Sequence, residues 1–126
     1  MNVLIIGGGN MGSTFAEGFL SAHIIRPHQL FILEINEERA ANLRQRDRGI
    51  IKTEVGDYIS DVDLIVLAVK PQNVAQVYPS IRPFLKPNQL VLSIMAGVRL
   101  KSIEKGLGIK KIIRSMPNLP AKVGMG

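Results

Sequence analysis

The feature that most constrains this chain is a regular alternation of short apolar runs with amphipathic stretches. Four runs are almost continuously apolar, and they cover Val3–Ile6, Leu30–Leu33, residues 64–69 and residues 90–94. Apolar runs of this length are typical of strands that are covered on both faces, as in a parallel sheet. Two weaker candidates for strands are the pairs Ile50-Ile51 and Ile112-Ile113.

Helical spacing of apolar residues fills the segments between these runs. It covers residues 11–22 and Glu37–Arg46, and Asn36 is placed to cap the second of these helices. Residues 71–85 are predicted as a helix that starts with a proline in its first turn and is interrupted at Pro79 or Pro83. A short helix is expected over Leu100–Leu107, and residues 57–60 are ambiguous.

Strands and helices that alternate in this order require right-handed crossovers between parallel strands. We therefore predict an α/β fold with a doubly wound parallel sheet. The chain has 126 residues, 46% of them hydrophobic, which is room for a single domain over residues 1–126.

The composition excludes several classes of protein. The chain contains no cysteine, so a disulfide scaffold, a thiol nucleophile and a Cys-ligated zinc site are excluded. No apolar run approaches the ~20 residues of a membrane span, and no basic region or cleavage site of a signal peptide accompanies the first run. We expect a cytoplasmic protein that has neither a metal nor a membrane as its partner.

Charge is distributed unevenly along the chain. Residues 1–63 carry 6 basic and 9 acidic side chains, a balance of −3, and residues 64–126 carry 10 basic and 1 acidic, a balance of +9. Such a basic half can attract nucleic acid, an acidic partner or an anionic small molecule. Aromatic residues amount to only 5% and are scattered, so no stacking platform for RNA is present. We expect no nucleic-acid partner and interpret most of these charges as a solvated face.

A glycine-rich segment joins the first predicted strand to the first predicted helix. Its sequence over residues 7–12, GGGNMG, contains the spacing G-x-G-x-x-G at Gly7, Gly9 and Gly12. In this setting Gly7 permits a tight turn, Gly9 lets the main chain touch a pyrophosphate, and Gly12 allows close packing of helix on strand. Main-chain N–H groups at the helix start favour the anion. The segment predicts a dinucleotide site in a Rossmann-like domain, and the alternative is a glycine-rich turn without a ligand.

An acidic residue, Glu34, ends the second predicted strand 22 residues after Gly12. A carboxylate at this position accepts hydrogen bonds from the ribose hydroxyls of adenosine. It also repels a 2′-phosphate, so Glu34 favours NADH over NADPH, although Arg39 nearby can soften the discrimination. The alternative is an ordinary exposed glutamate at a strand end.

Two further segments end predicted strands at the carboxyl edge of the sheet, where open α/β sheets bind ligands. Lys70 ends its strand sharply because a proline, Pro71, follows it. The Lys70 side chain either faces the cofactor or an anionic substrate, or is solvated. The small residues of Met95-Ala96-Gly97 leave space for a flat nicotinamide ring, and they also permit a simple tight turn.

Groups able to perform acid–base or nucleophilic catalysis are few. His23 and His28 flank a turn at the wrong edge of the sheet, and Tyr58 and Tyr78 are interpreted as packing residues. No Ser-His-Asp, paired-carboxylate or metal-ligand pattern emerges from the sequence. Catalytic residues are therefore unassigned, and a cofactor is expected to supply the chemistry.

Four segments, taken in order, resemble the cofactor domain of pyrroline-5-carboxylate reductases. They are IIGGGNMG at residues 5–12, AVKPQ at 68–72, SIMAGV at 93–98 and RSMPNLPA at 114–121. The resemblance implies an NAD(P)H-dependent enzyme that reduces the imine of Δ1-pyrroline-5-carboxylate to L-proline, the last step of proline biosynthesis. Together with the residue analysis, it gives a cofactor-binding set of Gly7, Gly9, Asn10, Met11, Gly12, Glu34, Ala68, Val69, Lys70, Pro71, Met95, Ala96, Gly97 and Asn118.

The resemblance also implies a larger protein. Members of this family carry a C-terminal helical domain that forms the dimer and supplies the pocket for the substrate carboxylate, and we expect that domain to be absent from this chain. A homodimer or larger assembly is expected only where it is present. The sequence also departs from the family at Leu119, where a threonine is usual. Two alternatives are a non-catalytic dinucleotide-binding module and a reductase domain of similar fold that acts on another substrate, of the β-hydroxyacid dehydrogenase or deazaflavin-dependent type.

Overall fold

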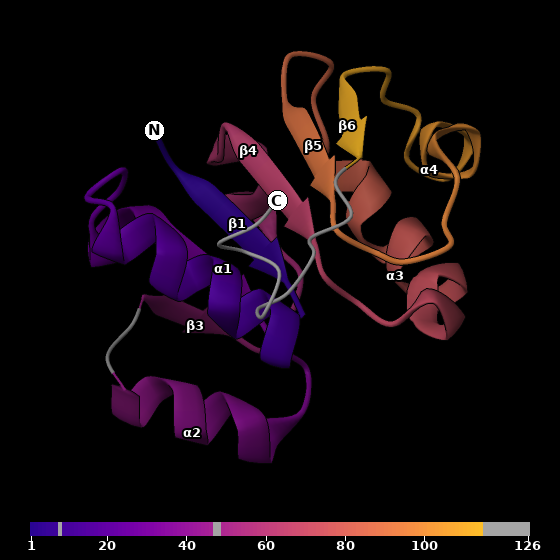
Figure 1. The fold of residues 1–126 in the computed structure, drawn as a ribbon. Helices are drawn as coiled ribbons and strands as arrows, with labels where there is room; N and C mark the ends of the chain where they lie inside the picture. Colours follow the sequence, from indigo (N-terminus) through magenta and orange to yellow (C-terminus); the bar gives the residue numbers. More distant parts are fainter. Residues whose placement is uncertain (8, 47–48, 115–126) are drawn as a thin grey trace, which may run out of the picture.

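The computed structural model describes residues 1–7, 9–46 and 49–114. Within these residues six parallel strands form one sheet in the order β3-β2-β1-β4-β5-β6 (Figure 1). The strands are β1 (Val3–Ile6), β2 (Leu30–Leu33), β3 (Ile50–Lys52), β4 (Leu64–Leu67), β5 (Leu90–Ser93) and β6 (Ile112–Arg114). The α-helices are α1 (Asn10–Ser21), α2 (Glu37–Arg46), α3 (Val74–Ile81) and α4 (Leu100–Leu107). The doubly wound α/β fold predicted from the sequence is therefore confirmed.

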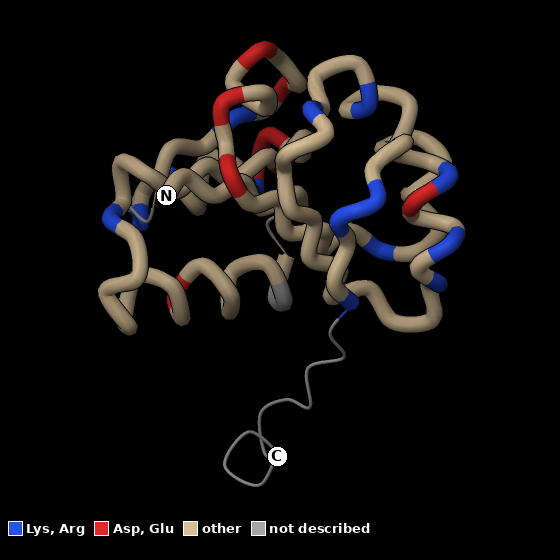
Figure 2. Tube along the Cα trace, turned by 90° about the horizontal axis from the view of Figure 1, so that it is seen from above, with Lys and Arg blue, Asp and Glu red and all other residues tan. Residues whose placement is uncertain are grey.

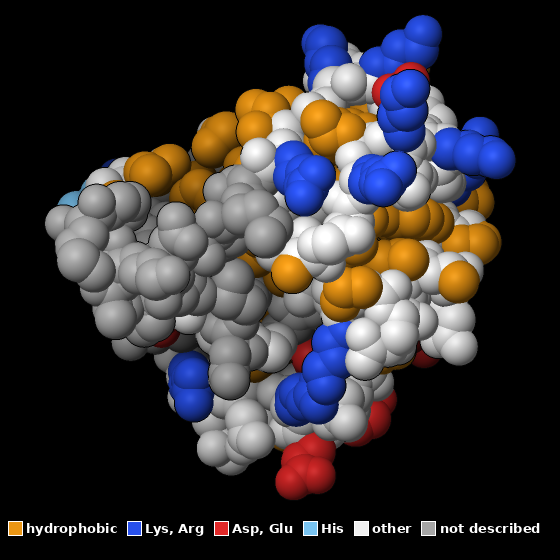
Figure 3. Space-filling model, turned by 45° about the vertical axis from the view of Figure 1, so that its right-hand side comes forward, with side chains coloured by type: hydrophobic (Ala, Val, Ile, Leu, Met, Phe, Trp, Pro, Cys, Tyr) orange, Lys and Arg blue, Asp and Glu red, His pale blue; other side chains and the backbone are white. Residues whose placement is uncertain are grey.

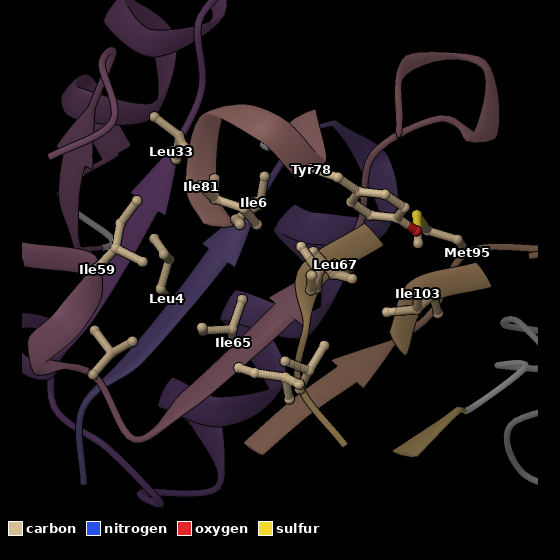
Figure 4. Packing of buried hydrophobic residues seen from close by; sticks show 14 of the residues in the cluster. Leu4, Ile6, Leu33, Ile59, Ile65, Leu67, Tyr78, Ile81, Met95 and Ile103 are labelled. Carbon is tan, nitrogen blue, oxygen red and sulfur yellow. The ribbon is translucent and has the colours of Figure 1, made fainter. Parts of the chain in front are cut away.

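Two buried clusters lie on the two faces of the sheet. Val3 and Ile5 of β1 belong to one cluster, together with residues of α1 and α2. Leu4 and Ile6 belong to the other, together with residues of α3 and α4, part of which is drawn in Figure 4. Because successive side chains of a strand point to opposite faces, each uninterrupted apolar run supplies both cores at once.

The predicted strands have the right positions, but two of them are shorter than expected. The strand predicted over residues 64–69 ends at Leu67, and the strand predicted over residues 90–94 ends at Ser93. The two weaker isoleucine pairs do form strands, β3 and β6, which lie at the two edges of the sheet. The ambiguous segment is a 3-10 turn, Asp57–Asp61.

The helix predicted to begin at Pro71 is divided into three parts. A 3-10 turn, Pro71–Asn73, precedes α3, and a second one, Arg82–Phe84, follows it. The α-helix therefore gives way around Pro83, which is one of the two predicted breaks. The other residue, Pro79, lies inside α3. Because proline has no N–H, the main-chain carbonyl of Ala75, four residues earlier, has no helical hydrogen-bond partner. Ala75 is an exposed residue.

Asn36 caps α2 as predicted. Its side-chain Oδ1 accepts a hydrogen bond of 2.9 Å from the main-chain N–H of Arg39, and its main-chain oxygen accepts one of 2.9 Å from Ala40. The cap fixes where α2 starts after β2, so the first turn of α2 stays close to the end of that strand.

The uneven charge of the sequence is also uneven in space. Figure 2 shows Lys and Arg dominating the side of the molecule that carries α4, and most Asp and Glu on the other side. Figure 3 shows these basic side chains projecting from the surface. Every Lys and Arg that the structure describes after residue 64 is exposed, as expected for a solvated face. Among the described residues, no helix has both the length and the apolar character needed to span a membrane.

Candidate functional site

The register of three central strands aligns the loops that follow them. Ile6 at the end of β1 pairs with Leu33 of β2 on one side and with Leu67 of β4 on the other. The residues after these strand ends are joined by main-chain hydrogen bonds, from the N–H of Gly7 to Leu33 O (2.9 Å) and from the N–H of Ala68 to Ile6 O (2.9 Å). Gly7, Glu34 and Ala68 therefore lie at one level along the carboxyl edge of the sheet, where the chain order of the strands reverses.

The glycines of the first loop have different structural roles. Gly7 has a φ of +102°, and a Cβ on it would lie 2.8 Å from Ala68 O. A Cβ on Gly12 would overlap the main-chain oxygen of Gly7, because α1 packs directly against the loop. A Cβ on Gly9 would meet no atom within 4 Å. Gly7 and Gly12 are thus required by the protein's own packing, whereas Gly9 borders open space.

Gly9 is also the N-cap residue of α1. A glycine has no side chain with which to cap the first N–H groups, so the main chain at the start of α1, at Asn10 and Met11, is suited to receive an anion. The open space over Gly9 and the helix start together form the geometry that a pyrophosphate requires.

The carboxylate of Glu34 is fixed at the end of β2. Only 5% of the residue is exposed, so it is not the exposed strand-end glutamate of the alternative interpretation. Its Oε2 accepts a hydrogen bond of 3.0 Å from the main-chain N–H of Asn36. Its Oε1 lies 3.8 Å from Nη1 of Arg39, whose side chain is 57% exposed. The carboxylate is therefore held in place by the loop, and the guanidinium beside it keeps freedom to move.

A cavity of about 770 Å³ opens along these strand ends. We call it the edge cavity. It is lined by Gly7 and Gly9, by residues 68–70 and by Glu34. Its volume lies within the range of about 300–1,000 Å³ that is usual for ligand sites.

One wall of the edge cavity comes from the start and inner face of α3. It is formed by Asn73, Gln76, Val77, Ser80 and Ile81. The sequence analysis did not assign these residues, although their spacing of three and four is that of a single helix face and offered a usable signal. Ile35, Glu54 and Val55 also line the cavity.

Lys70 lines the edge cavity on an extended piece of chain after β4. Its φ and ψ are −67° and 140°, and Pro71 after it starts a 3-10 turn. The residue is exposed. The structure thus brings Lys70 next to the glycine loop, whereas Pro71 does not line the cavity.

The loop after β5 is arranged differently from the loop after β1. Met95 is only 2% exposed and belongs to the buried cluster under α3 and α4. Its main-chain N–H donates to Oγ of Ser93 at 3.3 Å, and Gly97 has a φ of +73°. Ala96 and Gly97 are exposed. These three residues do not line the edge cavity, and Asn118 lies outside the described residues.

The two tyrosines pack as expected. Burial raises the pKa of Tyr58 to about 12, and it raises the pKa of Tyr78 as well. The Tyr58 hydroxyl donates to Glu54 O at 2.7 Å, and the ring of Tyr58 stacks on that of Phe31. The Tyr78 hydroxyl is buried and has no hydrogen-bond partner among the described residues. Neither residue lines the edge cavity.

A second cavity, of about 690 Å³, lies between α1 and α2. It shares Gly9, Arg39 and Lys70 with the edge cavity and is lined further by polar residues of both helices. The sequence analysis did not anticipate it. No group of three or more His, Cys, Asp or Glu residues that can hold a metal occurs in the part of the chain that the structure describes.

Comparison with known proteins gives a consistent result. The family described as "NADP oxidoreductase coenzyme F420-dependent" matches residues 2–97. Pyrroline-5-carboxylate reductase of Escherichia coli is 36% identical over 123 residues, which are 96% of this chain and 45% of the relative. The pyrroline-5-carboxylate reductase structure from Coxiella burnetii matches with a TM-score of 0.83 and 28% identity, over 97% of this chain and 46% of the other.

A further solved structure carries a bound dinucleotide. It is the pyrroline carboxylate reductase of Plasmodium falciparum with NADP bound, which matches with a TM-score of 0.79 and 29% identity, over 98% of this chain and 45% of the other. The chain spans about half the length of the curated relatives it matches. These comparisons confirm the resemblance that the four sequence motifs predicted.

Proposed function

Because the chain belongs to the family described as NADP oxidoreductase coenzyme F420-dependent, we propose that it is the cofactor-binding part of a pyrroline-5-carboxylate reductase. The whole enzyme transfers a hydride from NAD(P)H to the imine of 1-pyrroline-5-carboxylate and forms L-proline. The observation that carries the proposal is the edge cavity, which opens over the bare main chain of Gly9 and is bordered by the buried Glu34.

We assign the edge cavity to the adenosine half of the dinucleotide. Leu33, Val69 and Val77 give it apolar surfaces against which a flat base packs. Ile35, 73% exposed, extends this apolar surface at the rim. A cavity that combines apolar walls with a few fixed polar groups is typical of a nucleoside site.

The pyrophosphate is assigned to Gly9 and the start of α1. Its charge is favoured there by the N–H groups of the first helical turn, around Asn10 and Met11, and by the positive end of the helix dipole. Lys70, which lines the same cavity, adds a positive charge within reach of the phosphates. The nicotinamide then extends toward residues 95–97 and Asn118.

We propose that Glu34 selects NADH over NADPH. Its carboxylate is held at the strand end, where it accepts hydrogen bonds from the ribose hydroxyls and repels a 2′-phosphate. NADP is bound in the Plasmodium falciparum relative, so the family as such does not impose this preference. Arg39 is the residue that opposes it, because its guanidinium lies beside the same carboxylate.

The chemistry required of this chain is mainly positioning. When bound, NAD(P)H supplies the hydride, and the imine carbon of the substrate is already electrophilic. Holding the dinucleotide in one orientation therefore contributes more than a strong general acid would. We propose that the whole enzyme acts in the cytoplasm as a homodimer or larger assembly formed through the family's C-terminal domain.

The experiment that tests the cofactor assignment is an NADH titration of the chain, followed by the fluorescence of the dinucleotide. In Gly9→Val the new side chain enters the open space that the pyrophosphate needs, so we expect binding to fall by at least about a hundredfold, or about 2.7 kcal/mol. Gly18→Val is the matched control, because a Cβ on Gly18 also meets nothing within 4 Å but lies far along α1. Unchanged NADH affinity in Gly9→Val would refute the assignment.

Turnover tests the substrate. Proline formation from pyrroline-5-carboxylate and NADH, measured with the chain and with a longer chain that includes the family's C-terminal domain, supports the reductase. Binding of NADH without proline formation by either chain restricts the function to a dinucleotide-binding module, and turnover of a different substrate places the chain in another reductase type of the same fold.

A further inference from the structure

We propose that one half of the carboxyl edge of the sheet, at β5 and β6, attracts small carboxylate ions at long range through exposed basic side chains. We call this group of side chains the basic rim, and its members are Arg99, Lys101 and Arg114. None of them lines the edge cavity or the cavity between α1 and α2. The inference rests on the proposed function in one respect, namely that the carboxylate attracted there is that of the substrate.

The members of the basic rim lie at the ends of two neighbouring strands. Arg114 ends β6, where it pairs in register with Ser93, the last residue of β5. Arg99 follows the loop after β5 as the N-cap residue of α4, and Lys101 lies in the first turn of that helix. Because all strands of the sheet are parallel, the rim lies at the same edge as the edge cavity.

No acidic side chain close in sequence balances the basic rim. The only acidic residue of the chain after position 63 is Glu104, which lies in the second half of α4. All three members of the rim are exposed. Within the part of the chain that the structure describes, none of their side chains takes part in a hydrogen bond or an ion pair. Their positive charge therefore acts on the solvent outside the protein.

Helix stability does not account for these charges. The first turn of α4 contains no acidic residue, and the side chain of Arg99 makes no capping hydrogen bond. The N-terminus of a helix carries a partial positive charge, so a cation beside it is unfavourable. The helix dipole thus adds to the positive field of the rim, and the two basic residues at the start of α4 increase that field without stabilising the helix.

The other half of the same edge has the opposite sign. Four glutamates lie at the ends of β2 and β3 and in the first turn of α2, against two basic residues, Arg39 and Lys52. The glutamates are Glu34, Glu37, Glu38 and Glu54. Figure 2 shows the same division between the two sides of the molecule, and Figure 3 shows how far the basic side chains project. The charge of the edge therefore changes sign between β2 and β6.

A change of sign along one edge sorts small anions by position. Clusters of like charge produce potentials of several kT, which raise the local concentration of counter-ions and the rate of encounter. The field reaches about 10 Å at an ionic strength of about 0.1 M. Residues 95–97, to which the nicotinamide is assigned, come shortly before Arg99 in the chain. The rim therefore brings a carboxylate to the nicotinamide end of the site rather than to the adenosine end.

The test measures where small ions gather around the ¹⁵N-labelled chain. The probes are carboxy-PROXYL, carbamoyl-PROXYL and aminomethyl-PROXYL, nitroxides that share a five-membered nitrogen ring and are an anion, a neutral molecule and a cation. A nitroxide increases the transverse relaxation rate of nearby amide protons. At low salt we expect the anion to relax residues 96–101 at least about twofold more than the cation, and the order to reverse at residues 34–38. At about 0.5 M salt both differences should disappear.

Substitutions assign the effect to the rim. The double variant Arg99→Gln, Lys101→Gln should lower the preference of residues 96–101 for the anion by about half. Arg26→Gln is the matched control, because Arg26 is exposed and precedes β2, at the opposite edge of the sheet. Its removal takes away the same charge and should leave residues 96–101 unaffected. None of the three residues belongs to either cavity.

A rate measurement connects the rim to turnover. In a longer chain that includes the family's C-terminal domain, the double variant should lower kcat/KM for pyrroline-5-carboxylate by about threefold at low salt. The value of kcat should stay unchanged, because the rim acts on encounter and not on the bound substrate. The difference between the variant and the unsubstituted chain should disappear at about 0.5 M salt, and Arg26→Gln should show no such difference.

The inference is overturned if the anionic and cationic probes relax residues 96–101 equally at low salt. It is also overturned if Arg26→Gln lowers the preference for the anion as much as the double variant does, or if the double variant leaves kcat/KM unchanged at low salt. The nitroxide measurement is made without dinucleotide or substrate, so it is independent of the proposed function. If the nitroxides show the expected pattern while the unsubstituted longer chain does not turn over pyrroline-5-carboxylate, the proposed function fails and the attraction of carboxylates by the rim is supported.

Discussion

The loops after β1 and β5 both contain a glycine in a left-handed conformation, but they differ in how much open space they leave beside the sheet. Each follows a buried strand at the carboxyl edge of the sheet, and each contains a glycine with positive φ, Gly7 at +102° and Gly97 at +73°. After β1 the chain leaves open space over Gly9, whereas after β5 Met95 turns into the core. The direction taken by the larger neighbours therefore decides whether the small residues after a strand border an open cavity or a packed loop.

The largest effect that tests this difference is on folding. In Gly12→Ala the new Cβ overlaps the main-chain oxygen of Gly7, so the helix must move away from the strand. We expect the free energy of unfolding to fall by about 3 kcal/mol or more, measured by urea denaturation. Gly9→Ala, whose Cβ meets no atom, should change it by less than about 0.5 kcal/mol. Equal costs for the two variants would contradict the separate roles of these glycines.

A second large effect is expected at the loop after β5. Met95→Ala removes a buried side chain from the cluster shared by α3 and α4, at an expected cost of about 2–4 kcal/mol in the free energy of unfolding. Met95→Leu conserves volume and should cost less than about 1.5 kcal/mol. If Met95 instead contacts the dinucleotide through its side chain, Met95→Leu will weaken NADH binding while leaving stability nearly unchanged.

A smaller effect concerns the choice of dinucleotide. Glu34→Ser removes the carboxylate that repels a 2′-phosphate, and we expect the ratio of NADPH to NADH affinity to rise about tenfold, or about 1.4 kcal/mol. The two dissociation constants are measured by titration of the same preparation. Glu38→Ser is the control, since Glu38 is exposed on α2 and does not line the edge cavity. An unchanged ratio in Glu34→Ser means that this residue does not recognise the ribose.

The smallest effect is expected at Tyr78. Figure 4 shows its ring in the same buried cluster as Met95, and its hydroxyl has no hydrogen-bond partner among the described residues. Tyr78→Phe should therefore leave the thermal midpoint unchanged or raise the stability by at most about 1 kcal/mol. Tyr58→Phe loses a real hydrogen bond, to Glu54 O, and should cost about 1 kcal/mol. A clear loss of stability in Tyr78→Phe would reveal a partner for this hydroxyl.

Much of the fold could be predicted from the sequence because both faces of the sheet are covered. Strands of this kind are continuously apolar, and this made β1, β2, β4 and β5 recognisable without a structure. The C-terminal end of β4 was predicted too far along the chain, because Ala68 and Val69 are apolar for a reason that has nothing to do with the strand. They are half-buried and line the edge cavity, so they continue the apolar pattern after the strand has ended.

The candidate site was only partly accessible to the same reasoning. Gly9 was predicted from the G-x-G-x-x-G spacing, Glu34 from its place at the end of the second strand, and Lys70 from the rule that ligands bind at the carboxyl edge of the sheet. The spacing along α3 marks one face of that helix, but the position of this face over the site depends on how the helices pack, as does the cavity between α1 and α2. Arg46 illustrates this. It lines the cavity between α1 and α2, whereas Arg44, which has the same charge and lies on the same helix, reaches Ile51 O instead.

The in-register pairing of Ile6 with Leu33 has a consequence for how the domain tolerates change. Side chains along a strand alternate between faces, so inserting or deleting one residue within β2 would turn every following side chain of that strand over. Either the core or Glu34 would then be misplaced. Insertions in the turn between α1 and β2, at the opposite edge, leave this alignment intact, and length variation among natural homologues should therefore concentrate there.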